Sequence, residues 1–232
     1  MARKKLQRYA ELPHLPNVFH NPKHMKGHWR GGYFKNNNPI TLELACGRGA
    51  YTLGLAQKFP ERNLLGVDAK GDRIWKGAKA ALALQLNNVA FLRGHIEWLA
   101  DYFAAGEVAE IWVTFPEPHP KRSKAKCRLT SPRFLNVYRA LLSNNGLVHF
   151  KTDDQALFDF TLETLQAEHC PIHRVVADVH HMESADELLQ IQTTYESRFL
   201  AEGRTIKYIC FGLTQSSGPM PLFFNNSADR KL

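Results

Sequence analysis

Two acidic residues and two glycines between positions 43 and 68 form the first pattern in this sequence that is suited to binding a ligand. Glu43 precedes the turn Ala45-Cys-Gly47-Arg-Gly49, and Asp68 ends the next apolar run. Glycine lets a ligand approach the backbone closely, and carboxylates accept hydrogen bonds from ribose hydroxyls and pair with cations. We therefore expect Glu43, Gly47, Gly49 and Asp68 to bind a ligand that carries both a ribose and a positive charge.

S-adenosylmethionine, which has a sulfonium, an ammonium and a ribose, fits these two acids better than a dinucleotide does. The glycines follow the spacing A-x-G-x-G rather than the G-x-G-x-x-G of dinucleotide-binding turns, so a nicotinamide-dependent dehydrogenase is disfavoured. Taken alone, the same residues also suit a tight strand–helix turn with incidental glycines.

A proline-rich segment supplies the second candidate. Prolines at positions 116, 118 and 120 surround Glu117, and a run of lysines and arginines follows. Each proline fixes its own φ and restricts the residue before it, so the loop is stiff enough to hold Glu117 toward a ligand. The basic run is suited to a phosphate backbone. The alternative is an ordinary surface loop followed by a solvated charged stretch.

Charge points to the same segment. The chain has 232 residues and a formal net charge of +8. Residues 1–30 hold seven Lys or Arg against one Glu, and residues 115–133 hold six against one. Two basic segments around an otherwise slightly acidic body indicate a polyanionic partner.

The elements that must position these residues alternate along the chain. Apolar runs predict strands at 39–45, 63–68, 89–93, 110–115, 146–151, 174–178 and 206–212, and helical patterns occupy 50–59, 72–86, 97–103, 132–142 and 154–168. This alternation predicts an α/β fold with a mostly parallel sheet, in which one or both of the last two strands run antiparallel at the edge. Because parallel strands present their carboxyl ends at one crevice, Glu43, Asp68 and Glu117 should meet there.

Several classes of protein are disfavoured. No apolar stretch follows the basic N-terminus, and none approaches the length of a membrane span, so we expect no membrane partner. The four cysteines are far apart, which argues against a zinc ribbon or a disulfide framework and favours a cytoplasmic location. Histidines 14, 20, 24 and 28 lack an acidic or cysteine co-ligand, and we expect no metal. Monomer and homodimer both stay open.

Three further motifs carry a family resemblance. They are Arg128-Leu-Thr-Ser-Pro-Arg-Phe134, His149-Phe-Lys-Thr-Asp153 and Thr193-Thr-Tyr-Glu196. With the proline-rich segment, they resemble motifs of the bacterial tRNA (guanine-N7)-methyltransferases over roughly residues 39–213. Several motifs in the same order are far more specific than any one of them.

The resemblance implies a Rossmann-like class I methyltransferase fold, with a seven-stranded, mostly parallel sheet and helices on both faces. It implies a methyltransferase domain at 39–214, with a basic N-terminal arm at 1–38 and a tail at 215–232. The cofactor would be S-adenosylmethionine, bound by Glu43, Gly47, Gly49, Asp68, His95 and Glu97. Glu117 would be the catalytic residue. The guanosine or its tRNA would be contacted by Lys121, Asp153, Thr193, Thr194, Tyr195 and Glu196.

The implied reaction transfers a methyl group to N7 of a guanine in tRNA, in the variable loop by the same resemblance. N7 has a free lone pair, so catalysis needs positioning and charge placement rather than a general base. Three residues depart from the family pattern: Ala45 replaces a glycine, Glu117 an aspartate and His119 a tryptophan. They motivate two alternatives, a methyltransferase acting on another RNA and a non-catalytic RNA-binding paralogue.

Overall fold

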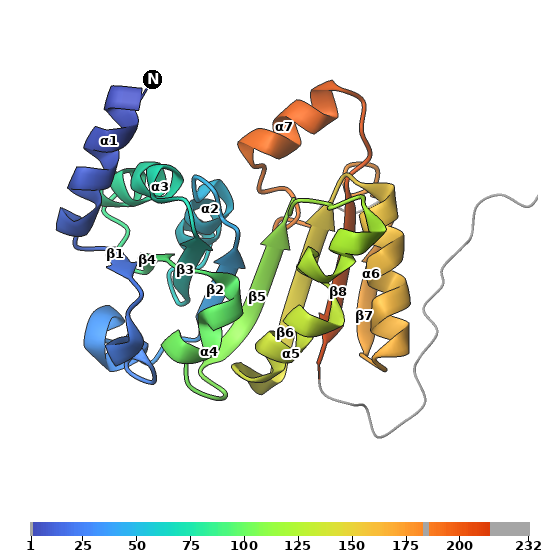
Figure 1. Cartoon of the computed structure of the whole chain (residues 1–232), viewed down its shortest axis with the longest axis horizontal. Coiled ribbons are helices and arrows are strands. Elements are labelled where there is room, and N and C mark those ends of the chain that lie inside the picture. The colour runs from blue at the N-terminus through green and yellow to red at the C-terminus, as the bar shows by residue number, and fades with distance from the viewer. Residues whose placement is uncertain (1, 183–185, 214–232) are drawn as a thin grey trace, which may run out of the picture.

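The computed structural model describes residues 2–182 and 186–213 and consists of one sheet covered by helices on both faces (Figure 1). The sheet has eight strands in the order β1-β4-β3-β2-β5-β6-β8-β7. Their bounds are β1 Val18–His20, β2 Ile40–Leu44, β3 Asn63–Asp68, β4 Val89–Arg93, β5 Val108–Thr114, β6 Leu142–Thr152, β7 Ile172–Val176 and β8 Lys207–Gly212.

The sheet is parallel from β1 through β6. Strand β8 lies antiparallel between β6 and β7, so the expected antiparallel strand is present near this edge. The expectation of seven strands is wrong, because β1 pairs with β4 from Val18 opposite Phe91 to His20 opposite Arg93. A strand of three residues between Pro16 and Pro22 is too short to produce a two-residue hydrophobic period, which is why the sequence pattern did not reveal it.

Helices cover both faces of the sheet, as expected. The α-helices are α1 Ala2–Glu11, α2 Ala50–Lys58, α3 Gly71–Ala83, α4 Leu99–Tyr102, α5 Pro132–Arg139, α6 Gln155–Ala167 and α7 Thr194–Ala201. Segments of 3-10 or π-helix lie at Leu12–His14, Lys23–Met25, Trp29–Phe34, Ile96–Trp98 and Arg122–Cys127.

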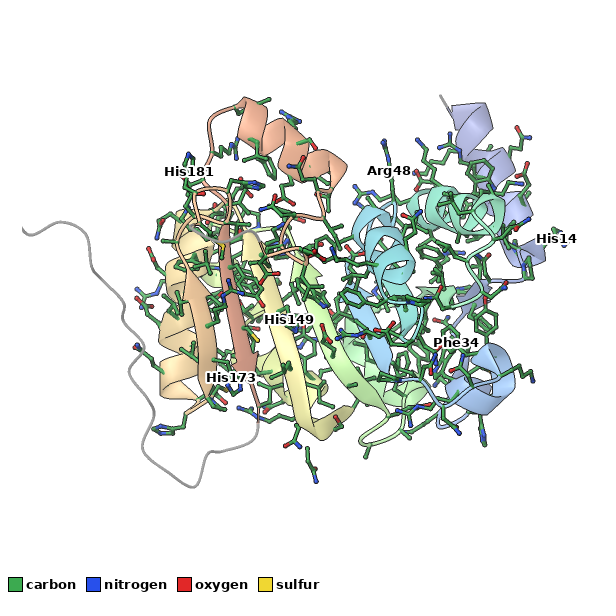
Figure 2. The ribbon with its side chains drawn as sticks, turned by 180° about the vertical axis from the view of Figure 1, so that it is seen from behind. His14, Phe34, Arg48, His149, His173 and His181 are labelled. Carbon is green, nitrogen blue, oxygen red and sulfur yellow. The ribbon has the colours of Figure 1, made fainter. Side chains whose placement is uncertain are left out.

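Two apolar clusters fill the space between the sheet and these helices. Figure 2 draws the side chains on the ribbon. One packs α4, α5 and α6 against one face, and the other packs α2 and α3 against the opposite face. Neighbouring residues of β5 divide between them, because Val113 belongs to the first cluster and Trp112 to the second. This is the alternation that a strand buried on both faces requires.

The basic N-terminal segment packs closely against the sheet domain. Helix α1 lies beside α3, where Trp75 Nε1 donates a hydrogen bond to Glu11 Oε2 at 2.9 Å. Trp29 is fully buried and its Nε1 donates to the Tyr102 carbonyl at 2.9 Å. Residues before position 38 therefore pack with the α/β alternation that follows them, and the boundary at residue 38 stays a prediction from the sequence.

Helix α7 rises from the insert before β8 and lies over the carboxyl ends of β5 and β6 (Figure 1). The proposed tail at 215–232 lies outside the described residues. Among the helices that the structure describes, none is long and apolar enough to cross a membrane.

Candidate functional site

The turn after β2 depends on left-handed backbone conformations. Ala45, Gly47 and Gly49 have φ values of 56°, 58° and 69°. A Cβ on Gly49 would come within 2.5 Å of Phe91 Cε1, so this position requires glycine for space as well as for conformation. At Gly47 a Cβ would meet nothing within 4 Å, which leaves open space beside the backbone.

Asp68, at the end of β3, is oriented by that turn. Its side chain is buried, and Oδ2 accepts a hydrogen bond from the Gly47 N–H at 2.9 Å. Oδ1 accepts one from the Lys70 N–H at 2.7 Å. Each carboxylate oxygen has a further lone pair, so the group is held in place and still able to accept a hydroxyl.

A cavity of about 380 Å³ opens at the carboxyl ends of the central strands. Four of the residues proposed from the sequence line it: Asp68, His95, Glu97 and Glu117. Its wall also includes Ala45, Ile96, His119, Leu129, Arg133 and Phe134. The volume falls within the range of sites that hold a small organic ligand.

Glu117 reaches this cavity from the loop after β5. Phe115 and His119 on either side of it both have positive φ, at 48° and 44°, so the loop makes sharp turns around the proline-flanked glutamate. The Glu117 side chain is 80% exposed, and its Oε1 lies 3.8 Å from His119 Nδ1. The carboxylate is therefore free to meet a ligand.

Glu43 occupies a different position from the one expected, because it lies beneath the turn rather than along the cavity wall. It is buried; Oε2 accepts from the Thr52 N–H at 2.8 Å and from the Thr52 hydroxyl, and Oε1 accepts from the Thr114 hydroxyl at 2.8 Å. Burial raises the pKa of Glu43 to about 7, although these hydrogen bonds oppose the rise. In this geometry Glu43 joins β2, α2 and β5.

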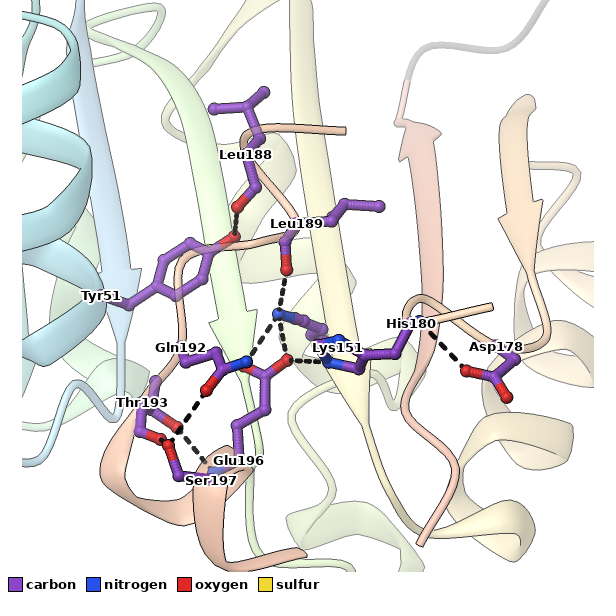
Figure 3. Close-up of polar contacts among 10 residues, drawn as sticks. All are labelled: Tyr51, Lys151, Asp178, His180, Leu188, Leu189, Gln192, Thr193, Glu196 and Ser197. Atoms are coloured by element: carbon purple, nitrogen blue, oxygen red, sulfur yellow. Dashed lines mark hydrogen bonds and ion pairs between the residues drawn. The ribbon is translucent and has the colours of Figure 1, made fainter. Parts of the chain in front are cut away.

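A buried ion pair fixes α7 above the sheet (Figure 3). Lys151 Nζ lies 2.6 Å from Glu196 Oε1 and donates to the Leu189 carbonyl at 2.8 Å. His180 Nε2 lies 3.0 Å from the same Glu196 oxygen. Burial lowers the pKa of Lys151, while the Glu196 carboxylate favours the charged form. Glu196 is fully buried, and its second oxygen, Oε2, accepts a hydrogen bond from Lys151 Nζ at 2.8 Å, so both oxygens are engaged.

Lys151 and His180 were missed among the functional candidates. Lys151 stands inside the motif His149-Phe-Lys-Thr-Asp153, and its signal was a lysine within an otherwise buried strand. A buried lysine needs a paired charge, but the sequence does not say which of many acids supplies it.

The remaining candidates lie outside the residues that line the cavity. Thr193 caps α7 by accepting the Glu196 N–H at 3.1 Å, and Tyr195 is half-exposed. Asp153 pairs with Arg204 at 2.8 Å, and Lys121 is exposed. The side chain of Thr194 lies outside the described part of the structure. No group of His, Cys, Asp and Glu suited to a metal occurs among the residues described here.

Comparison with known proteins identifies the family and the fold of this chain. Residues 37–209 match the family described as "Putative methyltransferase". Among solved structures, the 16S rRNA methyltransferase KamB superposes with a TM-score of 0.59 at 17% identity, covering 79% of this chain and 90% of that chain. At this identity the likeness concerns the fold alone, which is that of Rossmann-like methyltransferases.

Relatives of known name are much closer in sequence. The tRNA (guanine-N(7)-)-methyltransferase of Bacteroides fragilis is 44% identical over 93% of this chain and 88% of its own length. That of Cytophaga hutchinsonii is 45% identical over 91% of this chain and 98% of its own length. The expectation from the three motifs is thereby confirmed: the chain belongs to the tRNA (guanine-N7)-methyltransferase family.

Proposed function

We propose that this protein transfers a methyl group from S-adenosylmethionine to N7 of a guanine in tRNA. The observation that carries the proposal is the single cavity in which the oriented carboxylate of Asp68 and the exposed carboxylate of Glu117 face the same space. The names of the two bacterial relatives supply the substrate class.

The residues present fit the cofactor. Asp68 has lone pairs left for two ribose hydroxyls, and Gly47 leaves open space beside the turn. His95 and Ile96 stand along the cavity wall where an adenine would follow the ribose, with Glu97 beside them. We keep Gly49 as the residue that permits the turn, and we now assign Glu43 to supporting it from below.

The chemistry requires little of the protein beyond geometry. S-adenosylmethionine supplies a methyl group on a positively charged sulfur. The N7 lone pair forms the new N–CH₃ bond while the S–CH₃ bond breaks and its electron pair stays on sulfur, so the positive charge passes to the base. Glu117 would stabilise this charge as it develops, because its carboxylate faces the cavity in which the base becomes positive.

Helix α7 would contribute to the RNA-binding surface beside the cavity. A target base must leave its stack to reach such a cavity. Tyr195 exposes half of its surface and is suited to stack on a base, whereas Glu196 is held by Lys151 and His180 and would set the position of the helix. We propose Lys121, Asp153, Thr193 and Thr194 as further contacts to the guanosine or its tRNA.

Five finer assignments complete the proposal. The methylated guanosine is the one in the variable loop, and the protein acts in the cytoplasm as a monomer or a homodimer. The methyltransferase domain spans residues 39–214, close to the matched region at 37–209. No metal takes part.

The test is methyl transfer itself. The protein is incubated with labelled S-adenosylmethionine and unmodified tRNA, and the nucleosides are identified by mass spectrometry. We expect 7-methylguanosine, and chemical cleavage at that nucleoside should place it in the variable loop. Transfer only to a ribosomal or other RNA would favour the first alternative. Absence of any S-adenosylmethionine binding by calorimetry would favour the non-catalytic paralogue.

A further inference from the structure

A second, smaller hollow lies beside the cofactor turn. Its volume is about 170 Å³, and residues from four parts of the chain line it. Arg8 comes from α1, Gly47 and Arg48 from the turn after β2, and Tyr195 from α7. Helix α3 contributes Asp72, Arg73 and Lys76. We call this hollow the α1–α3 cleft.

Positive charge dominates the α1–α3 cleft. Four cationic side chains surround it against the single acid Asp72. Among the described residues, none of the four cations takes part in an ion pair. The guanidinium of Arg8 lies 5.2 Å above the Trp75 ring, which holds it in place without neutralising it. Gathering four positive charges around one negative charge costs free energy, and a bound anion would recover part of it.

The size of the cleft indicates what kind of anion it would take. About 170 Å³ is too small for a nucleotide but large enough for a phosphate group. Arginine matches the geometry of phosphate oxygens, and lysine acts on them as a point charge. The half-exposed ring of Tyr195 on the rim offers a flat face to a base attached to that phosphate.

The position of the cleft relates it to the reaction. Gly47 lines the cleft on one side of the turn and donates its N–H to Asp68, which lines the cofactor cavity on the other. Arg48 stands on this turn next to α2, on the side of the molecule where α1 and α3 lie (Figure 2). Of the lysines and arginines in 121–133, Arg133 lines the cofactor cavity, whereas Arg48 lines the α1–α3 cleft.

We propose that the α1–α3 cleft binds the phosphate backbone of the RNA beside the nucleotide that is methylated. This rests on the proposed function and adds to it the place where the strand is held. Arg8, Arg48, Arg73 and Lys76 contact phosphate oxygens, Tyr195 stacks on a neighbouring base, and α1 takes part in substrate binding although it precedes the methyltransferase domain.

Two matched variants test the proposal. Arg48→Gln/Lys76→Gln removes two charges from the cleft, and Lys35→Gln/Lys79→Gln removes two from exposed positions outside it. tRNA affinity is measured by filter binding across a range of salt, S-adenosylmethionine affinity by calorimetry, and folding by thermal denaturation. For the cleft variant we expect at least a tenfold loss of tRNA affinity and a salt-dependence slope smaller by about two, one for each lost phosphate contact. The control variant and the cofactor affinity should change little.

The contrary outcomes are separate. If the wild type methylates tRNA and both variants bind it equally well, the proposal fails and the proposed function stands. If the cleft variant loses affinity for S-adenosylmethionine while its tRNA affinity is unchanged, the cleft serves the carboxylate of the cofactor and the proposal fails. If the wild type neither binds nor methylates tRNA, the proposed function fails first and the cleft proposal with it.

Discussion

The Nζ of Lys151 lies 2.6 Å from Glu196 Oε1, and neither side chain reaches solvent. Lys151 belongs to β6, whose carboxyl end borders the site, and Glu196 belongs to α7, which covers that end. A charge buried without its partner costs several kcal/mol. The pair therefore links the position of α7, and of the exposed Tyr195 on it, to the central sheet.

Removing one member of this pair should destabilise the protein strongly. Lys151→Met leaves the Glu196 carboxylate buried with only His180 beside it, and we expect a loss on the order of 3–5 kcal/mol in urea denaturation. Lys151→Met/Glu196→Leu should recover a large part of that loss, since no lone charge remains. Arg198→Gln, which breaks an exposed pair with Glu202, is the control and should change little. If the free-energy losses from Lys151→Met and Glu196→Leu simply added in the double variant, the two side chains would not be energetically coupled.

Glu43 should make stability depend on pH. Its ordinary pKa of 4.5 rises to about 7 in the folded protein, mainly through burial. Between these values the unfolded chain releases a proton that the folded protein retains, so stability falls as pH rises from about 5 to 7. In Glu43→Gln this contribution disappears. Between pH 5 and pH 8, urea denaturation should show the free energy of unfolding of the wild type falling by roughly 3 kcal/mol more than that of Glu43→Gln. The same change with pH in both proteins would contradict this prediction.

Ala45 is expected to carry backbone strain, since its φ of 56° is one that residues with a Cβ adopt at a cost. In Ala45→Gly the relief of this strain should stabilise the protein by about 1 kcal/mol. The greater conformational entropy of glycine in the unfolded chain offsets part of that gain. Thermal denaturation measures this directly. Ala83→Gly, at the end of α3, is the comparison and should destabilise. A lower melting temperature for Ala45→Gly would contradict the assignment of strain.

Glu117 should act on the rate of transfer more than on the binding of either partner. We expect Glu117→Gln to lower kcat by roughly 10²-fold, because a neutral amide no longer stabilises the developing positive charge. Glu117→Asp, which restores the residue usual in the family, should keep most of the activity. Single-turnover methyl transfer at saturating tRNA separates rate from affinity, with the exposed Glu163→Gln on α6 as control. An unchanged rate of methyl transfer in Glu117→Gln would show that Glu117 is not a catalytic residue.

Asp68 should serve the cofactor alone. Asp68→Ala removes the acceptor proposed for two ribose hydroxyls and leaves the Gly47 N–H without its hydrogen-bond acceptor. We expect the affinity for S-adenosylmethionine to fall by roughly 10- to 100-fold. tRNA affinity should change little. Lys124→Ala/Lys126→Ala, in the exposed basic run, should show the reverse and a smaller salt dependence. Equal losses of both affinities in either variant would mean that the two binding functions are not separable.

The residues that turn the chain were the ones best predicted from the sequence. Gly47 and Gly49 adopt the left-handed conformations that their type suggests, and Asp68 ends β3 as expected. Such signals are local, because they depend on the conformational range of one residue and the hydrophobic period of its neighbours. The carboxyl-end rule for parallel strands then brought Asp68 and Glu117 to one cavity.

The direction in which buried acids point was predicted less well. Glu43 and Glu196 both stand in motifs that suggest ligand contact, yet the structure engages them with Thr52 and Thr114 in one case and with Lys151 and His180 in the other. A strand alternates its side chains between two faces, and the sequence does not tell which face opens into the cavity and which meets another helix.

The sequence by itself determined the alternation of strands and helices, the glycine turn and the family, whereas the residues that do its chemistry stay predictions. Only the tertiary structure decided that β1 extends the sheet, that α1 brings Arg8 to the side of the cofactor turn, and that Lys151 is the partner of Glu196. These relationships join residues about 40 to 70 positions apart. Pairing at that range is selected by the packing of the whole fold rather than by local propensity, because each contact becomes favourable only after others have brought its members together.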